Sequence, residues 1–210
     1  MSVPDRSIDA RLLSAAMEEF LEKGYENASL KEICGKAGVT TGALYKRFDG
    51  KEDLFNALVA DTVRGMEQYG TAVSEEELKK FSDQELYDLM AMSAEANLGW
   101  LRFLYERKER LRLLVKCASS TRYADFHHEL AEKMGEISYL SYLEARRRGM
   151  TERNLTKEEI HVLTTGVWAM ICEPFVHDFT WEQIVEHAHL MQDFIDWHRV
   201  FGMKRGCRTK

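Results

Sequence analysis

Apolar residues recur every three or four positions through most of this chain, which is the spacing of one face of an α-helix. In the first fifty residues the pattern predicts three helices, from Ile8 to Gly24, from Leu30 to Ala37, and from Thr40 to Phe48. Beyond them it predicts helices over residues 51–69, 82–104, 107–116, 123–148, 156–172 and 180–201. Because alternating runs with hairpin turns do not occur, we expect an all-α fold.

Residues that cap helices stand at five of the predicted starts. The Ser/Thr-x-x-Glu spacing of a capping box occurs at Ser29–Glu32, Ser82–Glu85 and Thr156–Glu159, and single threonines precede two more helices at Thr40 and Thr180. The side chains of such residues accept hydrogen bonds from the first free N–H groups of a helix. These positions therefore support the predicted helix boundaries.

The second and third helices are joined by the tight turn Ala37-Gly38-Val39, which is the arrangement of a helix-turn-helix. Leu30, Ile33, Cys34 and Ala37 give the second helix one apolar side, and Val39, Leu44 and Phe48 do the same for the third. The other side of the third helix carries residues that can touch base edges and phosphates, namely Thr41, Ala43, Tyr45, Lys46 and Arg47.

Residues 8–58 resemble the DNA-binding domain of the TetR family of bacterial transcriptional regulators. The resemblance depends on the first helix that stops at Gly24, the Ala-Gly-Val turn, the Gly-x-Leu-Tyr-x-x-Phe run from Gly42 to Phe48, and Lys51-Glu52-Asp53-Leu54. It implies a homodimeric, ligand-responsive transcription factor, a repressor more often than an activator, that binds a palindromic operator in double-stranded DNA.

From the motif and the resemblance together we expect eight residues at the DNA. Ser29 and Thr40 would cap helices and meet phosphates, Thr41, Ala43 and Tyr45 would face the major groove, and Lys46, Arg47 and Lys51 would meet phosphates. Thr41 and Ala43 replace the family's usual lysine and threonine, and Arg47 replaces a frequent histidine. Gly35 inside the second helix should cost about 1 kcal/mol of helix propensity relative to Ala. We expect a shifted sequence preference.

The net charge of the chain restricts the kinds of partner that it can bind. The chain has 210 residues, with 29 Lys and Arg against 35 Asp and Glu, so it is no polycation that binds any nucleic acid. Length and the Glu- and Lys-rich stretch at 70–82 suggest two parts. We expect a helix-turn-helix domain at 1–50 and an effector-binding and dimerisation domain at 51–210, with 51–69 as linking helix. Neither a signal peptide nor a long apolar run occurs, and we expect a cytoplasmic protein.

The last two predicted helices have apolar residues on more than one side, which calls for two packing partners. One is the core of the same domain, and the other is the same helix pair of a second chain, unless both helices are fully buried within one chain. Bulky side chains that could line an effector cavity, each also compatible with ordinary core packing, are Trp100, Phe103, Phe126, Met134, Trp168 and Met170.

Other readings of the residues stay open. Glu158–His161 and Glu186–His189 have the spacing of a di-metal helical bundle, but no further glutamate-bearing helix separates them, so we expect no metal, no cofactor and no enzyme. A helical effector-binding protein that no longer reads DNA is the other alternative, because of Thr41 and Ala43. Arg146-Arg147-Arg148 fits a solvated helix end better than a nucleic-acid patch, and Cys34, Cys117, Cys172 and Cys207 fit free thiols better than a redox sensor.

Overall fold

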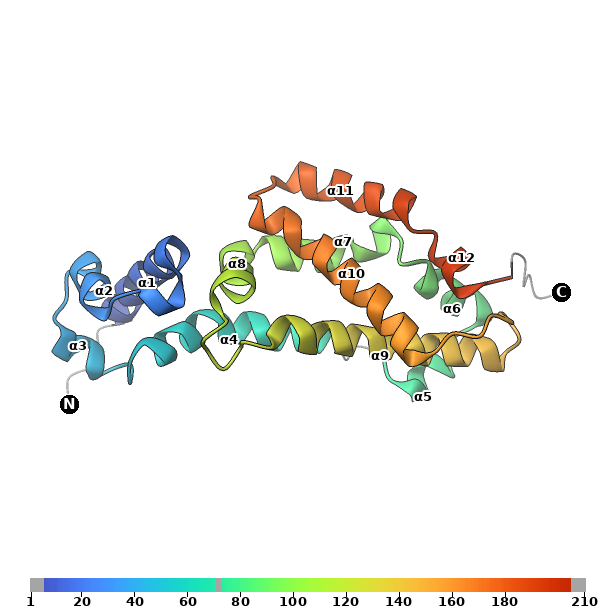
Figure 1. Cartoon of the computed structure of the whole chain (residues 1–210), viewed down its shortest axis with the longest axis horizontal. Coiled ribbons are helices and arrows are strands. Elements are labelled where there is room, and N and C mark those ends of the chain that lie inside the picture. The colour runs from blue at the N-terminus through green and yellow to red at the C-terminus, as the bar shows by residue number, and fades with distance from the viewer. Residues whose placement is uncertain (1–5, 71–72, 205–210) are drawn as a thin grey trace. The chain divides into compact units, whose positions relative to one another are not determined.

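The computed structural model describes residues 6–70 and 73–204, and within these residues every named element is a helix. A single isolated bridge, between Thr151 and Met203, is the one β-type pairing there. The helices are α1 (Arg6–Asn27), α2 (Leu30–Ala37), α3 (Thr41–Tyr45), α4 (Lys51–Gly70), α5 (Glu75–Leu78), α6 (Asp83–Ala91), α7 (Ala94–Tyr105), α8 (Lys108–Cys117), α9 (Phe126–Arg147), α10 (Lys157–Val176), α11 (Trp181–Phe194) and α12 (Trp197–Phe201) (Figure 1). The all-α prediction is confirmed.

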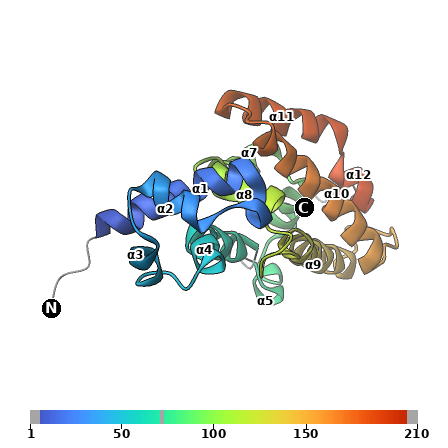
Figure 2. The same ribbon diagram turned by 60° about the vertical axis from the view of Figure 1, so that its left-hand side comes forward.

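The first compact unit combines the chain up to Met66 with residues 107–127. Both α2 and α8 pack on α1, as the turned view shows (Figure 2). The rings of Phe20, Tyr25 and Phe55 pack against one another at centroid distances of 5.5–5.7 Å, and Leu12, Ile33 and Leu54 are fully buried. The cysteine at the end of α8, Cys117, donates its thiol to the carbonyl of Phe20 at 3.3 Å. This unit therefore has its own apolar core.

The second compact unit combines residues 67–106 with the chain from His128 onward. Its core draws on α5, α6, α9, α10 and α12, and its buried members are Leu78, Leu86, Met90, Tyr142, Ala145, Met150, Ile160, Val167, Trp197, Phe201 and Met203. The α11 helix packs on α7 and α10 (Figure 1). The two units divide the chain at other residues than the predicted functional domains, so the assignment of functions to 1–50 and 51–210 stays a prediction.

Four of the five predicted caps are confirmed. The side chains of Thr40, Ser82, Thr156 and Thr180 each accept a backbone N–H three residues later, and the boxes at Ser82 and Thr156 are closed by their glutamates. The box at Ser29 is wrong, because the Ser29 side chain makes no capping bond. The Ser29 N–H that Glu32 would have bound instead donates to the carboxylate of Glu19 at 3.3 Å.

Two predicted long helices are each interrupted. The helix expected over 82–104 breaks where Met92 adopts a left-handed φ of 47°, and Ser93 then caps α7 by accepting the Ala96 N–H. The helix expected over 180–201 ends at Phe194, and Asp196 caps the short α12. In both places the side chain of a capping residue accepts an N–H group at the start of the second helix. The apolar pattern of the sequence continues across the bend and therefore does not indicate the break. The structure adds α5, which the sequence pattern did not predict.

Pro174 lies inside α10, which runs to Val176 instead of ending near Cys172 as predicted. A proline in a helix has no N–H to donate to the carbonyl four residues earlier. That carbonyl belongs to Met170, and it accepts a hydrogen bond from Nε2 of His187 at 3.0 Å. The neighbouring helix α11 thus satisfies the acceptor that the proline leaves without its helical donor.

The arginines at the end of α9 are not all solvated, so the expectation of a solvated helix end holds for only part of the triplet. Arg148 is largely buried and donates to the backbone carbonyls of Leu78, Lys79 and Phe81, and it pairs with Asp83 at 3.0 Å. Its Nε also pairs with the buried carboxylate of Glu144 at 2.6 Å. Arg148 therefore connects α9 to the end of α5 and the start of α6.

The Arg147 and Arg148 guanidinium groups hold the pKa of Glu144 at about 2, below its usual value of 4.5. A carboxylate with a lowered folded-state pKa contributes stability above its unfolded pKa and loses it as the pH falls through the folded value. We expect unfolding free energy to fall between about pH 4.5 and pH 2, and we expect Glu144→Gln to flatten this part of the profile. Denaturant titrations across that pH range measure the unfolding free energy. Parallel pH profiles of the unsubstituted chain and Glu144→Gln would contradict the prediction.

Candidate nucleic-acid interface and internal cavity

The turn between α2 and α3 is made by Gly38, which adopts a left-handed φ of 63° that favours glycine. The N–H groups of Gly38 and Val39 donate to the carbonyls of Gly35 and Cys34 at 3.1 and 3.0 Å, which closes α2. One residue later the Thr40 hydroxyl accepts the Ala43 N–H at 3.2 Å and starts α3. The predicted helix-turn-helix is therefore present, with a third helix of five residues.

One buried side chain anchors α3. Leu44 is fully buried, whereas Thr41, Gly42 and Tyr45 are exposed and Ala43 is half-buried. Tyr45 exposes 58% of its surface, which is unusual for a large aromatic residue. Exposed aromatic and hydroxyl side chains beside the exposed Lys46 form a surface suited to base edges and phosphates. We call Thr40, Thr41, Tyr45 and Lys46 the reading face.

Glu19 of α1 holds the start of α2 in place. Its buried carboxylate pairs with Lys23 at 2.8 Å and with Lys36 of α2 at 3.1 Å, and it accepts the Ser29 N–H. The bonds from Lys23, then from Lys36 and Ser29, lower the pKa of Glu19 against the opposing effect of its burial. The carboxylate thus makes the bond to the Ser29 N–H that was expected of Glu32, and it ties α2 to α1.

The structure places the eight predicted DNA residues in three groups. Thr40, Thr41, Tyr45 and Lys46 are exposed on the reading face, while Ala43 and Ser29 are half-buried. Arg47 and Lys51 form the third group, because both make hydrogen bonds or ion pairs within the unit.

Arg47 forms an ion pair with Asp9 of α1 at 2.6 Å and donates to the Ala43 carbonyl at 3.1 Å. Lys51 donates to the carbonyls of Glu26 and Ala28 at 2.9 and 3.3 Å and lies over the ring of Tyr25. Two of the predicted phosphate ligands therefore hold the helices of this unit together.

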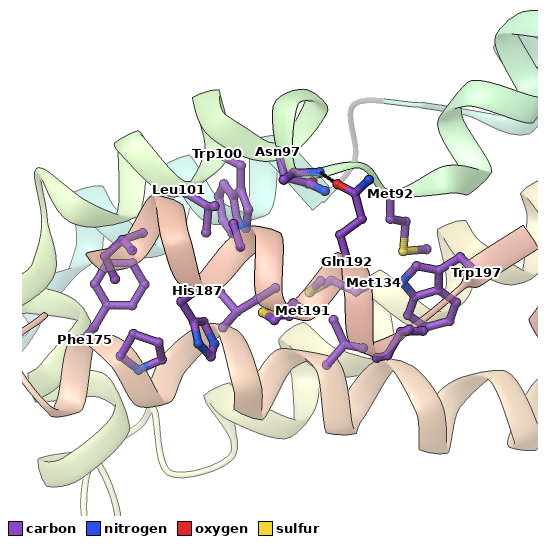
Figure 3. Close-up of a pocket in the computed structure, with 17 residues that line it drawn as sticks. Met92, Asn97, Trp100, Leu101, Met134, Phe175, His187, Met191, Gln192 and Trp197 are labelled. Carbon is purple, nitrogen blue, oxygen red and sulfur yellow. Dashed lines mark hydrogen bonds between the residues drawn. The ribbon is translucent and has the colours of Figure 1, made fainter. Parts of the chain in front are cut away.

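A cavity of about 100 Å³ lies in the second unit among α7, α9, α10 and α11. It is lined by Met92, Ala94, Asn97, Trp100, Leu101, Met134, Val167, Ile171, Pro174, Phe175, Ile184, His187, Ala188, Met191, Gln192, Ile195 and Trp197. Figure 3 shows Trp197 and Met92 at one end of this row of side chains and Phe175 at the other. Most of the lining is aromatic, aliphatic or thioether, as in small-molecule sites.

Two of the six predicted effector residues, Trp100 and Met134, line this cavity. Phe103 stacks on Trp100 outside the lining, Trp168 is fully buried, and Phe126 is buried in the first unit. Met170 instead lines a surface groove along α10, α11 and α12.

The sequence pattern did not indicate three polar residues that line the cavity, Asn97, His187 and Gln192. Their signal is a polar residue on an otherwise apolar helix side, as His187 stands between Ile184, Ala188 and Met191.

An exposed apolar surface lies on α10 and α11. Val162 exposes 68% of its surface, Leu163 41%, Leu190 56% and Phe194 77%. Val162, Leu163 and Phe194 also line the groove that contains Met170. We call these four residues the apolar face. Large side chains gathered in this way usually mark an interaction surface.

Neither thiol chemistry nor metal binding stands out in the described part of the chain. Burial raises the pKa of Cys34, Cys117 and Cys172, which disfavours the reactive thiolate, and Cys207 lies outside the described residues. Among residues 6–70 and 73–204, no three His, Cys, Asp or Glu side chains are grouped to hold a metal ion. None of the helices in those ranges combines the length and apolar character needed to cross a membrane.

A short third helix that follows a tight turn and exposes Thr41 and Tyr45 is the arrangement found in helix-turn-helix DNA-binding proteins. Residues 12–58 match the profile of the bacterial regulatory proteins of the tetR family. The chain is similar to the transcriptional regulator SrpR of Pseudomonas putida, with 26% identity over 186 residues, which cover 78% of this chain and 85% of SrpR. It is also similar to the transcriptional repressor BepR of Brucella suis, with 44% identity over 48 residues, or 23% of each chain.

Solved structures agree on the fold. The TetR-family regulator PfmR of Thermus thermophilus is 19% identical and superposes with a TM-score of 0.59 over 89% of this chain and 97% of PfmR. Residues 12–58 therefore carry the DNA-binding domain of the bacterial regulatory proteins of the tetR family, and the solved structure supports the fold of the chain as a whole.

Proposed function

We propose that the protein is a ligand-responsive repressor that binds a palindromic operator as a homodimer. The observation that carries the DNA-reading part is the reading face, where exposed Thr41, Tyr45 and Lys46 stand on a helix anchored by the buried Leu44. The name of the relative BepR, a transcriptional repressor, supports the sign of regulation. A bound dimer at a promoter would exclude polymerase from it.

The apolar face supports the homodimer. A single recognition helix spans only a few base pairs, whereas two held about 34 Å apart read successive major grooves. Twofold symmetry brings the same surface of both chains together, so an apolar surface on α10 and α11 would cover itself. Phe194, the most exposed large apolar residue of this surface, would lie at the centre of the four-helix contact.

Phe194→Glu should convert the dimer to a monomer at micromolar concentration, because it would bury an unpaired charge in the contact. Sedimentation velocity measures the change. Leu143→Glu serves as the matched control, since Leu143 is 40% exposed but lies on α9. A dimeric Phe194→Glu protein, or a monomeric unsubstituted chain, would refute the proposed interface.

Contacts on the reading face should divide into those that set affinity and those that set specificity. Lys46→Ala should weaken binding to all duplexes alike and reduce the slope of log K against log salt by about one unit. Thr41→Ser or Thr41→Val should change the ranking of operators, because the side chain faces base edges. Fluorescence anisotropy on a panel of duplexes, repeated at several salt concentrations, separates the two effects. An unchanged ranking in both Thr41 variants would place this residue away from the groove.

We propose a structural role for Arg47 and Lys51. Because both cations are bonded to α1 or to the turn after it, they position α3 and α4 and add positive potential near the reading face. Ser29 and Ala43 are half-buried, so we expect them to contact the DNA backbone or base edges less than the exposed residues do. Direct phosphate contact from this helix then depends chiefly on Lys46 and Thr40.

The proposal is tested by selecting bound sequences from random duplex DNA with the full chain. We expect enrichment of a palindrome whose half-sites are separated by about one helical turn. Recovery of no enriched sequence would favour the alternative, a helical effector-binding protein that does not read DNA. Enrichment of a single half-site would keep DNA reading and refute the dimeric arrangement.

The cavity in the second unit supports the effector response. A ligand that binds one arrangement of the chain better than another shifts the balance between them by its difference in affinity. We propose that an occupant of this cavity changes the affinity of the dimer for its operator. The cytoplasm, where operators lie, is the compartment in which this regulator would act.

A further inference from the structure

We propose that the cavity takes a neutral molecule with one aromatic ring and one O–H or N–H donor, of which phenol is the simplest example. This inference rests on the proposed function only in naming the occupant as the effector. The ligand class itself is argued from the size, charge and hydrogen-bonding groups of the cavity.

The size of the cavity limits the occupant to about one ring. Its volume of about 100 Å³ is well below the roughly 300–1,000 Å³ of drug-sized sites, and it is closer to the roughly 150 Å³ of a dry cavity that holds benzene. The rings of Trp100, Phe175 and Trp197 and the thioethers of Met92, Met134 and Met191 contribute to the wall. Aromatic edges and polarisable sulfur atoms favour an aromatic guest over an aliphatic one.

The charge of the lining excludes an ionic occupant. None of its residues is Lys, Arg, Asp or Glu, and His187 is the single histidine among them. A buried carboxylate or ammonium group without a partner charge is strongly disfavoured relative to water. The occupant should therefore bind in its neutral form.

The position of Pro174 fixes the hydrogen-bonding state of His187. Because Pro174 has no N–H, the Met170 carbonyl is free to accept from Nε2 of His187 at 3.0 Å. A carbonyl only accepts, so Nε2 carries the proton of the neutral ring, and Nδ1 has a lone pair. His187 lines the cavity, so in this tautomer its Nδ1 can accept a hydrogen bond from a ligand with an O–H or N–H group.

In two amide side chains at the cavity, one polar atom already makes a hydrogen bond within the protein. The Gln192 side-chain oxygen accepts the Ala94 N–H at 2.8 Å, which leaves its NH₂ group as a donor (Figure 3). The Asn97 NH₂ group donates to the Ser93 carbonyl at 2.9 Å, which leaves its oxygen as an acceptor. A hydroxyl group, which both donates and accepts, can pair with this set, whereas a hydrocarbon leaves it unpaired.

The test is calorimetric titration of the full, unsubstituted chain with four probes of similar size: phenol, toluene, cyclohexanol and benzoate. We expect phenol to bind about tenfold more tightly than toluene, because one added hydrogen bond is worth about that factor. Cyclohexanol, which keeps the hydroxyl group but not the aromatic ring, should bind more weakly than phenol. Benzoate should bind at least about a hundredfold more weakly than phenol.

A pair of variants on one helix tests the role of His187. His187→Phe keeps a ring of similar size but removes the acceptor, so phenol binding should fall about tenfold to the level of toluene, whose own binding should stay unchanged. His189→Phe is the matched control, because His189 lies on the same α11 but is exposed and does not line the cavity. Phenol binding by the control should equal that of the unsubstituted chain.

Equal binding of phenol and toluene, tight binding of benzoate, or unchanged phenol binding by His187→Phe would overturn the inference. Operator affinity is measured in parallel with and without phenol. If phenol binds in the expected order but leaves operator affinity unchanged, the ligand class stands and the effector role is refuted. If the operator binds but phenol does not, the DNA-reading proposal stands and this inference fails.

Discussion

Replacing Arg148 by Met should lower the unfolding free energy by about 3 kcal/mol or more, because it leaves the buried Glu144 carboxylate without its buried partner. The substitution also removes the donor to the carbonyls of Leu78 and Phe81, which lie at the end of α5 and just beyond it. The Phe81 carbonyl then loses the Arg148 donor, which adds a further penalty. Denaturant unfolding followed by circular dichroism measures the loss.

Arg147→Met is the matched control for this prediction. Arg147 binds the same carboxylate with two bonds of 2.7 Å, but its side chain is 64% exposed. Exposed ion pairs contribute about 0–1 kcal/mol, so the control should unfold almost as the unsubstituted chain does. Equal losses in the two variants would show that burial of Arg148 does not decide the strength of this connection.

Replacing Leu44 by Ala should abolish most operator binding and destabilise the first unit by about 2–5 kcal/mol. Leu44 is fully buried and is the one buried residue of the five in α3, so its truncation frees the helix that carries the reading face. The apparent affinity falls with the fraction of molecules that keep α3 docked. We expect at least about a tenfold loss, measured by anisotropy with an operator duplex.

Leu104→Ala separates loss of the reading face from general destabilisation. Leu104 of α7 is also fully buried, but it belongs to the second unit. Its truncation should cost a similar free energy while the folded protein retains operator affinity. Equal losses of operator affinity in the two variants would contradict the assignment of Leu44 as the anchor of α3.

Local sequence signals predicted much of this fold because they act over a few residues. The Thr40 cap, the Gly38 turn and the capping boxes at Ser82 and Thr156 depend on side chains within three positions of the helix start. The apolar stripe of α4 likewise follows from helical period alone, since Leu54, Leu58, Thr62 and Met66 are all buried. Each of these features was predicted correctly from the sequence.

Contacts between residues that are far apart in the sequence decided the features that local signals did not predict. Glu19 accepts the N–H of Ser29 in place of Glu32, and carbonyls at the end of α1 and in the turn after it accept from Lys51. Likewise Gln192 accepts the N–H of Ala94 at the break between α6 and α7, which no local pattern encodes. Such contacts depend on which helices pack together, and helical period does not specify that.

The sequence by itself determined the helix-turn-helix, the helical class and the residues available for a reading face, because short-range hydrogen bonding and apolar period fix them. Only the tertiary structure decided that Arg47 and Lys51 bond internally and that Arg148 is buried. It also decided that His187 meets the Met170 carbonyl beside a cavity. The physical reason is that a side chain's hydrogen-bonding state depends on neighbours that come from other helices.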